Sequence, residues 1–175
     1  MKVRREELWR KIYGDKPVFA LEVFLLAKYG DVILAGKPDS VLFHRGFPLV
    51  VFEYKFSRSE VAYTSYYVQA RTYGVLLQNM GFDTTRLFCA IVVAEPKTRG
   101  SRELRQNVMS NVAKNGPMEA VISIQDAKIY INRFDVAIAE KDLAWALEFW
   151  KNRREAQLAR NKNKCERCEY RVNCL

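Results

Sequence analysis

The amino-acid sequence predicts an α/β fold in which helices pack on a mixed β-sheet. A β-rich block comes first, at residues 19–56, where apolar and other residues alternate imperfectly at period two, as in half-buried strands. A predicted helix follows at residues 65–80. The continuous apolar run of residues 87–94 then indicates a buried strand, which we place at the centre of the sheet.

Turn residues divide the β-rich block into about four short strands, after a short basic helix predicted at residues 4–13. The turn signals are Tyr29-Gly30-Asp31, Gly36-Lys37-Pro38 and Arg45-Gly46-Phe47-Pro48. In the first strand, one alternating apolar set runs from Phe19 to Leu25. Because only short turns separate the strands, we expect them to be antiparallel neighbours.

Sequence patterns in the second half of the chain predict further helices and strands. Gly81 suits the C-terminal cap of the first long helix. The later elements expected are a polar helix at 101–114, short strands near 120–124 and 128–131, and a longer helix at 140–160. Leu143, Leu147 and Trp150 form one apolar stripe of that last helix.

Length and composition indicate one globular domain, residues 1–175. The 175 residues are 49% hydrophobic and 28% charged, which excludes a disordered chain and is enough for a buried core. No apolar stretch approaches the roughly 20 residues that span a bilayer, and the charged N-terminus has no apolar signal region. We therefore expect a cytoplasmic protein with no membrane partner.

The charge balance is basic, with 29 Lys and Arg against 20 Asp and Glu and a net charge of +9. Such a field attracts polyanions, of which nucleic acid is the commonest inside cells, although a charge that only keeps the protein soluble is the alternative. Two stretches are strongly basic. They are Lys97, Arg99, Arg102 and Arg105, and then Lys151, Arg153, Arg154, Arg160, Lys162 and Lys164.

Asp39, Glu53 and Lys55 are the strongest candidates for catalysis. Glu53 and Lys55 are two apart on one strand, so their side chains project from the same face. Asp39 starts the preceding strand, and hairpin pairing can bring it beside Glu53. Two carboxylates hold a hard cation such as Mg²⁺ or Mn²⁺, and a lysine can stabilise developing negative charge, as phosphodiester hydrolysis requires. A surface salt bridge between Glu53 and Lys55 is the alternative.

The helix after this strand adds two polar residues. Gln69 and Tyr73 are four apart and share a helix face, which can lie over the site. An amphipathic helix with a buried tyrosine is the alternative. Tyr63, Tyr66 and Tyr67 precede them; bases of single-stranded DNA can stack on such rings, and core packing explains the same residues equally well.

Three of the four cysteines, Cys165, Cys168 and Cys174, lie in a cysteine-rich tail at residues 161–175. Clustered cysteines in a cytosolic protein bind metal more often than they form disulfides. The fourth, Cys89, lies in the apolar run, where it is a small buried hydrophobe or a further ligand.

The order of these motifs resembles the RecB-type branch of the PD-(D/E)xK nuclease superfamily. The sequence carries G-x-x-D ending at Asp39, E-x-K at 53–55, Q-x-x-x-Y at 69–73 and a C-terminal C-x₂-C-x₅-C. With its small size, the chain looks most like the CRISPR-associated RecB-like exonucleases. The resemblance covers residues 22–174 and implies a restriction-endonuclease-like core, a mixed sheet flanked by helices.

This resemblance implies a role for each matched residue. Asp39 and Glu53 would bind Mn²⁺ or Mg²⁺, and Lys55 would be the catalytic lysine. Gln69 and Tyr73 would orient the attacking water or the DNA backbone. Enzymes of this kind cleave single-stranded DNA, often from an end.

The metal site departs from the family pattern at one ligand. The family usually supplies a histidine from a segment before the first strand, whereas the single histidine here is His44, which we interpret as a turn residue. The site would then consist of carboxylates, completed by water and the backbone carbonyl of Tyr54. Glu22, on the first strand, is a candidate accessory acid.

The cysteine motif also departs from the family. An iron–sulfur cluster usually takes four cysteines, and the family's fourth lies ahead of the nuclease core, where this chain has none. The tail would therefore share a cluster with Cys89 or with a non-cysteine ligand, hold zinc, or have lost the site.

The residues leave three functions open. The first is a single-strand-preferring deoxyribonuclease that trims DNA ends before integration into a CRISPR array, in antiviral defence. The second is a weakened nuclease fold retained as a binding module, and the third is an endonuclease of recombination or repair. The expected partners are single-stranded DNA or DNA ends, CRISPR integration proteins, and further copies of the chain.

Overall fold

The structure is a computed structural model that describes residues 4–155. The chain divides into two compact units, Met1–Lys141 and Asp142–Leu175, and the division falls within the last helix. No helix in the described range is long and apolar enough to cross a membrane. The elements in chain order are α1 (Arg5–Ile12), β1 (Val18–Leu21), β2 (Leu25–Tyr29), β3 (Val32–Gly36), β4 (Ser40–His44), β5 (Phe47–Phe56), α2 (Thr64–Asn79), β6 (Phe88–Ala94), the 3-10 helix η1 (Pro96–Thr98), α3 (Arg102–Asn115), β7 (Ala120–Ile124), β8 (Ala127–Arg133) and α4 (Val136–Trp150).

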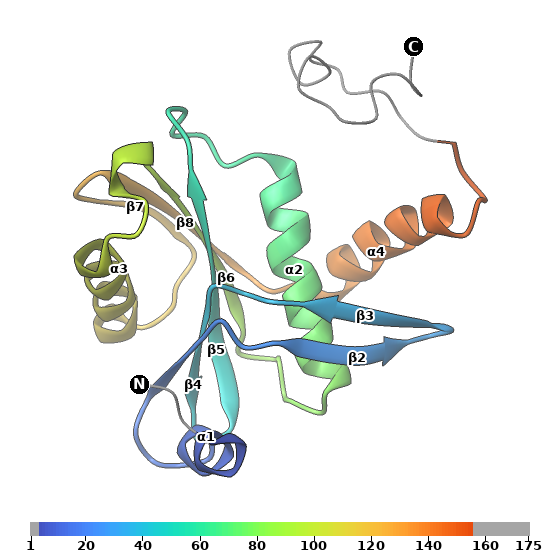
Figure 1. The fold of residues 1–175 in the computed structure, drawn as a ribbon, viewed down its shortest axis with the longest axis horizontal. Coiled ribbons are helices and arrows are strands. Elements are labelled where there is room, and N and C mark those ends of the chain that lie inside the picture. The colour runs from blue at the N-terminus through green and yellow to red at the C-terminus, as the bar shows by residue number, and fades with distance from the viewer. Residues whose placement is uncertain (1–3, 156–175) are drawn as a thin grey trace. The chain divides into compact units, whose positions relative to one another are not determined.

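Six strands of the first unit form one mixed sheet in the order β1-β4-β5-β6-β8-β7 (Figure 1). β5 and β6 run parallel and are joined through α2, as a parallel pair requires, whereas the other neighbouring pairs are antiparallel. The apolar run forms β6, between β5 and β8, which confirms its predicted place in the interior of the sheet.

Helices cover both faces of this sheet. Side chains alternate along β5, so Phe52 and Tyr54 pack with Leu104 and Val108 of α3 in one core cluster. α2 packs on β5 and β6 from the other face, and Figure 1 shows α2 and α3 on opposite sides of the sheet. The predicted α/β class, a mixed sheet flanked by helices, is confirmed.

The start of the β-rich block differs from the prediction. The sequence predicts one strand from Phe19 to Leu25, but β1 ends at Leu21 and β2 begins at Leu25. Glu22 lies between them at φ 51°, in the left-handed region, which ends an extended strand. β2 and β3 then form a separate two-stranded sheet, and β1 pairs with β4 instead of with its neighbour in sequence.

The last helix also differs. It begins at Val136 rather than at residue 140, because Asp135 Oδ1 accepts a hydrogen bond from the N–H of Ile138 at 3.1 Å and so acts as an N-terminal cap. The predicted end at residue 160 lies outside the described residues. Leu143 is buried, but Trp150 is 77% exposed, so the buried part of the expected apolar stripe does not include Trp150.

A methyl group at Gly74 tests how tightly α2 is packed. An ideal Cβ there would lie 2.4 Å from Cε2 of the buried Phe134 ring. Overpacking costs about 1–3 kcal/mol, whereas alanine gains roughly 1 kcal/mol over glycine in a helix. We therefore expect Gly74→Ala to lower the free energy of unfolding in urea, and adding Phe134→Leu to restore part of it. A variant more stable than the wild type would contradict this packing.

Candidate active site

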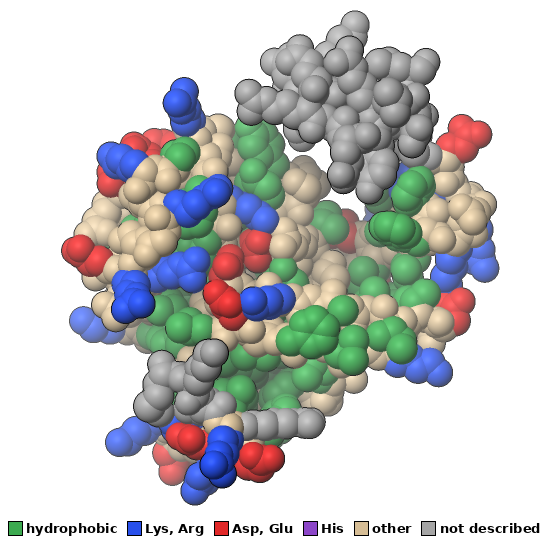
Figure 2. All heavy atoms as spheres, viewed as in Figure 1, with side chains coloured by type: hydrophobic (Ala, Val, Ile, Leu, Met, Phe, Trp, Pro, Cys, Tyr) green, Lys and Arg blue, Asp and Glu red, His purple; other side chains and the backbone are tan. Residues whose placement is uncertain are grey.

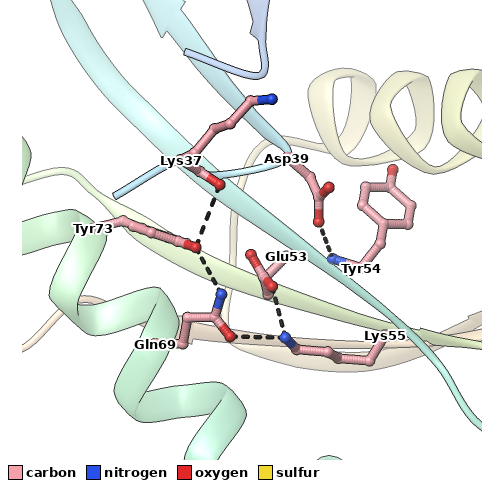
Figure 3. Close-up of polar contacts among 7 residues, drawn as sticks. All are labelled: Lys37, Asp39, Glu53, Tyr54, Lys55, Gln69 and Tyr73. Carbon is pink, nitrogen blue, oxygen red and sulfur yellow. Dashed lines mark hydrogen bonds and ion pairs between the residues drawn. The ribbon is translucent and has the colours of Figure 1, made fainter. Parts of the chain in front are cut away.

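The antiparallel hairpin of β4 and β5 brings two acidic residues together. Ser40 pairs with Phe52, which sets Asp39 across from Glu53, as hairpin pairing predicts. The backbone N–H of Tyr54 donates to Asp39 Oδ2 at 2.8 Å, which fixes that carboxylate against β5. Figure 3 shows the Asp39 and Glu53 carboxylates across from each other, with the Tyr54 ring directed elsewhere.

A β-bulge sets this register. Next to the turn, His44 pairs with Phe47, and that register continued along the hairpin would place Asp39 opposite Phe52. The pairing shifts by one residue in the middle of β4, which leaves Leu49 as the extra residue on β5. The bulge therefore decides that Asp39 faces an acid instead of an apolar side chain that points into the opposite core.

A chain of hydrogen bonds joins this hairpin to α2 (Figure 3). Lys55 Nζ donates to Glu53 Oε1 at 2.7 Å and to Gln69 Oε1 at 2.7 Å. Gln69 Nε2 donates to the Tyr73 hydroxyl at 2.7 Å, and that hydroxyl lies 3.4 Å from the carbonyl oxygen of Lys37. The structure thus brings together the five residues that the sequence singles out. They are Asp39, Glu53 and Lys55 of E-x-K, and Gln69 and Tyr73 of Q-x-x-x-Y.

Burial makes the charged form of the Glu53 carboxyl group energetically unfavourable. Glu53 is only 5% exposed, and its burial raises the pKa of the carboxyl group; the Asp39 charge adds to the rise, and the hydrogen bond and charge of Lys55 oppose it. Burial likewise raises the pKa of the Tyr73 hydroxyl. The Lys55 side chain is 22% exposed, so this pair is not the surface salt bridge that E-x-K alone would allow. Buried acids with a shifted pKa are common at functional sites.

The donor set fits Mg²⁺ or Mn²⁺. Among residues 4–155, no group of three or more His, Cys, Asp or Glu is placed to hold a metal ion, and the candidate donors are the two carboxylates of Asp39 and Glu53, which face each other across the hairpin. Mg²⁺ needs no more, because it keeps several waters and usually takes one or two carboxylates together with substrate phosphates. Tyr54 contributes its N–H to Asp39, and the ligand role of its carbonyl oxygen stays a prediction.

Glu22 lies close to Asp39 through the backbone. Its N–H donates to the carbonyl oxygen of Asp39 at 3.1 Å, while its side chain pairs with Lys37 Nζ at 2.8 Å. The hydrogen bond from Lys37 lowers the pKa of the Glu22 carboxyl, and the more distant Arg105 charge adds to this. Glu22 is therefore an ionised, ion-paired acid beside the candidate site, and its accessory role stays a prediction.

His44 and Cys89 are two further sequence candidates within the described residues. His44 is at the far end of β4 from Asp39, about 16 Å along the strand, and its Nε2 hydrogen-bonds the Asp15 carbonyl oxygen at 3.1 Å. Cys89 is buried on β6, and burial raises the pKa of its thiol to about 12. Cys165, Cys168 and Cys174 lie outside the described residues.

Two basic residues, Lys37 and Arg105, lie near the candidate site although no catalytic motif contains them as a defined position. Lys37 stands inside the G-x-x-D motif, where its position is the only sequence signal. Arg105 belongs to α3, and its guanidinium lies 5.2 Å from the centre of the Tyr54 ring. Figure 2 shows Lys and Arg side chains gathered over the part of the molecule that contains α3, with acidic side chains among them. Such charges attract phosphate groups.

An open groove of about 870 Å³ lies apart from these acids. Tyr67 and Arg71 of α2 and Arg133 of β8 line it, whereas Asp39 and Glu53 do not. Of the three tyrosines that precede Gln69, Tyr67 is therefore directed toward a different surface.

The sequence from residue 2 to residue 175 matches the model of the PD-(D/E)XK nuclease superfamily. The chain belongs to this superfamily. Pro38-Asp39 and Glu53-x-Lys55 fit the pattern in its name. PD-(D/E)XK nucleases hydrolyse phosphodiester bonds and typically use Mg²⁺ or Mn²⁺, which agrees with the donor set.

Other comparisons add little to this assignment. No curated protein matches the sequence significantly. A crystal structure described as that of SSO0001 aligns with a TM-score of 0.47 and 15% identity, over 97% of this chain and 64% of that chain. The chain thus spans less than two thirds of that protein.

Replacing Glu53 by glutamine should change how stability depends on pH. Because the folded pKa of Glu53 is raised, the folded wild type binds a proton more readily than the unfolded chain. Its stability relative to Glu53→Gln should be highest below the unfolded pKa of about 4.3 and should fall as the pH rises through the folded pKa. Urea unfolding of both proteins without divalent cations measures this. Parallel pH profiles would contradict it.

Cys89 should resist alkylation in the folded protein. Its thiol is buried and its pKa is raised to about 12, so the reactive thiolate is scarce and out of reach. We expect iodoacetamide at about pH 8 to leave Cys89 unmodified in native protein and to modify it in urea. Peptide mass spectrometry measures the modification of Cys89 in the native and in the urea-unfolded protein. Equal modification in the two would show that the Cys89 thiol is not buried in the folded protein.

Proposed function

We propose that this chain is a Mg²⁺- or Mn²⁺-dependent deoxyribonuclease that degrades single-stranded DNA from an end, with Asp39, Glu53 and Lys55 as its catalytic centre. One observation carries the proposal. A buried acid, Glu53, faces Asp39 across a hairpin and bonds Lys55 at 2.7 Å, within a superfamily of nucleases. An acid this buried is costly unless a cation compensates it.

The two carboxylates would hold the cation. Asp39 uses Oδ2 for the Tyr54 N–H, and Glu53 uses Oε1 for Lys55, but carboxylate oxygens each accept more than one partner. When bound, the cation polarises a phosphoryl oxygen and lowers the pKa of a water molecule.

Lys55 is placed to act on the phosphate. Its ammonium group has three N–H donors, of which Glu53 and Gln69 take two. The third donor can contact a phosphate oxygen or the attacking water, where it offsets the negative charge that develops. Because Glu53 and Gln69 hold the ammonium from two sides, it needs little rearrangement during the reaction.

Gln69 and Tyr73 are positioning residues in this account. The Gln69 oxygen accepts from Lys55 and its nitrogen donates to the Tyr73 hydroxyl, which fixes the amide orientation. The Tyr73 hydroxyl also reaches the Lys37 carbonyl oxygen, in the turn before Asp39. This chain holds the lysine and the turn in one arrangement.

The RecB-type and CRISPR-associated assignment extends the proposal. It is supported by the motif order, now with Gln69 and Tyr73 in contact with the candidate site. Under it, the chain trims DNA ends in CRISPR adaptation, alone or as an oligomer with integration proteins. The tail cysteines add a separate test. Iron and sulfide added anaerobically should give visible absorption if a cluster forms, and a colourless, iron-free protein would remove that part.

The catalytic assignment predicts a selective loss of cleavage. We expect the wild type to degrade end-labelled single-stranded DNA with Mn²⁺, and Glu53→Ala and Lys55→Ala each to lose at least about 100-fold in rate while still binding DNA. Glu103→Ala on α3 and Lys16→Ala, an exposed residue near the far end of β4, are matched controls that should cut normally. If no variant and no wild type cuts but all bind, the chain is a binding module.

An exonuclease and an endonuclease differ in whether they can cut closed circles of single-stranded DNA. A strict exonuclease needs an end, so covalently closed single-stranded circles should survive while the same sequence opened by one break is degraded. Gel analysis of both forms with the same protein reads the outcome. Circles that are cut at a similar rate would assign the chain to the endonucleases.

A further inference from the structure

Two tyrosines at the start of α2 form an aromatic pair beside the candidate catalytic lysine. The rings of Tyr63 and Tyr66 meet edge to face, with centroids 5.4 Å apart and planes at 85°. Lys55 Nζ lies 5.1 Å from the Tyr66 ring centre. The same ammonium bonds Glu53, so the aromatic pair adjoins the acids through a single side chain.

Tyr63 keeps a large part of its ring accessible. It is 48% exposed and stands immediately before the first residue of α2. An exposed ring next to a cation offers an unpaired base both a stacking surface and a nearby charge for its phosphate. A base within a duplex cannot use that surface, because both of its faces are already stacked on its neighbours.

The helix start breaks a local preference at Tyr63. This residue is the N-cap of α2, a place where Ser, Thr, Asp or Asn usually accepts a hydrogen bond from the first turn. Tyr63 makes no such side-chain bond, and the first turn of α2 contains no acidic residue. Tyr63 instead packs edge to face on Tyr66, and a departure from local preference of this kind is expected at functional sites.

Hydrogen bonds hold the segment before Tyr63 in place, so the Tyr63–Tyr66 pair is preformed. The N–H of Ser57 donates to the Ala94 carbonyl oxygen at 3.0 Å. The Tyr130 hydroxyl donates to the Glu60 carbonyl oxygen at 2.7 Å, and the N–H of Tyr66 donates to the Tyr63 carbonyl oxygen at 2.9 Å. A preformed surface binds without the entropic cost of ordering a loop.

We propose that the Tyr63–Tyr66 pair is a base-stacking wall that seats an unpaired nucleobase next to the phosphate held at Lys55 and so selects single-stranded substrates. The inference deepens the proposed function and rests on it. Tyr66 contacts the catalytic lysine and supports Tyr63 edge to face. Tyr63 provides the exposed ring on which the base lies.

A substrate that lacks one base tests the wall. Single-stranded oligonucleotides with an abasic nucleotide at successive positions from each end are compared with the intact strand. We expect the wild type to cleave the intact strand at least about fivefold faster than one abasic form, a modest share of the stacking energy of one base. In Tyr63→Ala that ratio should fall toward one, and Tyr63→Phe should keep it. Tyr13→Ala, a tyrosine 62% exposed on the α1 side, should keep the wild-type ratio.

A binding measurement separates this inference from the nuclease proposal. A strand with 2-aminopurine at the base that the abasic series identifies, or at each end in turn, is mixed with metal-free protein. Stacking should quench its fluorescence in the wild type and in Tyr63→Phe but not in Tyr63→Ala. A wild type that cuts DNA with equal rates on intact and abasic strands, or that quenches no differently from Tyr63→Ala, overturns the wall. If the wild type does not cut, the nuclease proposal fails, and quenching alone decides for or against the wall.

Discussion

The register between β4 and β5 is the constraint on which the candidate site depends. A one-residue slip in an antiparallel pair turns every side chain to the other face. Here the bulge at Leu49, beside Pro48, shifts the pairing so that Asp39 faces Glu53. Proline lacks an N–H for the ladder and is tolerated at bulges, which accounts for its place in an inner strand. The Tyr54 N–H then holds the Asp39 carboxylate, so backbone pairing and side-chain placement reinforce each other.

The second constraint is the cost of the buried acid. Glu53 lies under α2, where its charged form is disfavoured, and Lys55 offsets only part of that penalty. From the helix side, Gln69 accepts a second hydrogen bond from Lys55 and donates one to the Tyr73 hydroxyl. This face of α2 therefore contacts both the core, through the buried Tyr73, and the candidate site, through Gln69. The protein neighbours of Glu53 thus stabilise its charged form only in part, a condition that is common at functional sites.

Much of the fold follows from local patterns. The apolar run of β6 and the helix pattern that ends at Gly81 each predict an element that the structure contains. The motif spacing also predicts which residues meet, because E-x-K shares a strand face and Q-x-x-x-Y shares a helix face. These features depend on near neighbours in the chain, which a sequence displays directly.

Other features depend on contacts that a sequence does not display. The bulge is one extra residue in a run that looks continuous, and the left-handed turn at Glu22 interrupts an alternating pattern that predicts an unbroken strand. The N-terminal cap at Asp135 is a single short residue ahead of an otherwise regular helix. Arg105 comes near Tyr54 only because α3 packs on that face of the sheet.

We propose that Asp39 and Glu53 form one cation site because of this register. Mn²⁺ binding, followed by the loss of the free-ion electron paramagnetic resonance signal, is the sharpest test, since it does not depend on DNA or turnover. We expect a site in the wild type that both Asp39→Ala and Glu53→Ala weaken strongly, whereas Glu103→Ala on the surface of α3 leaves it unchanged. If Mn²⁺ binds to both Asp39→Ala and Glu53→Ala as tightly as to the wild type, the cation lies elsewhere and the proposed site is wrong.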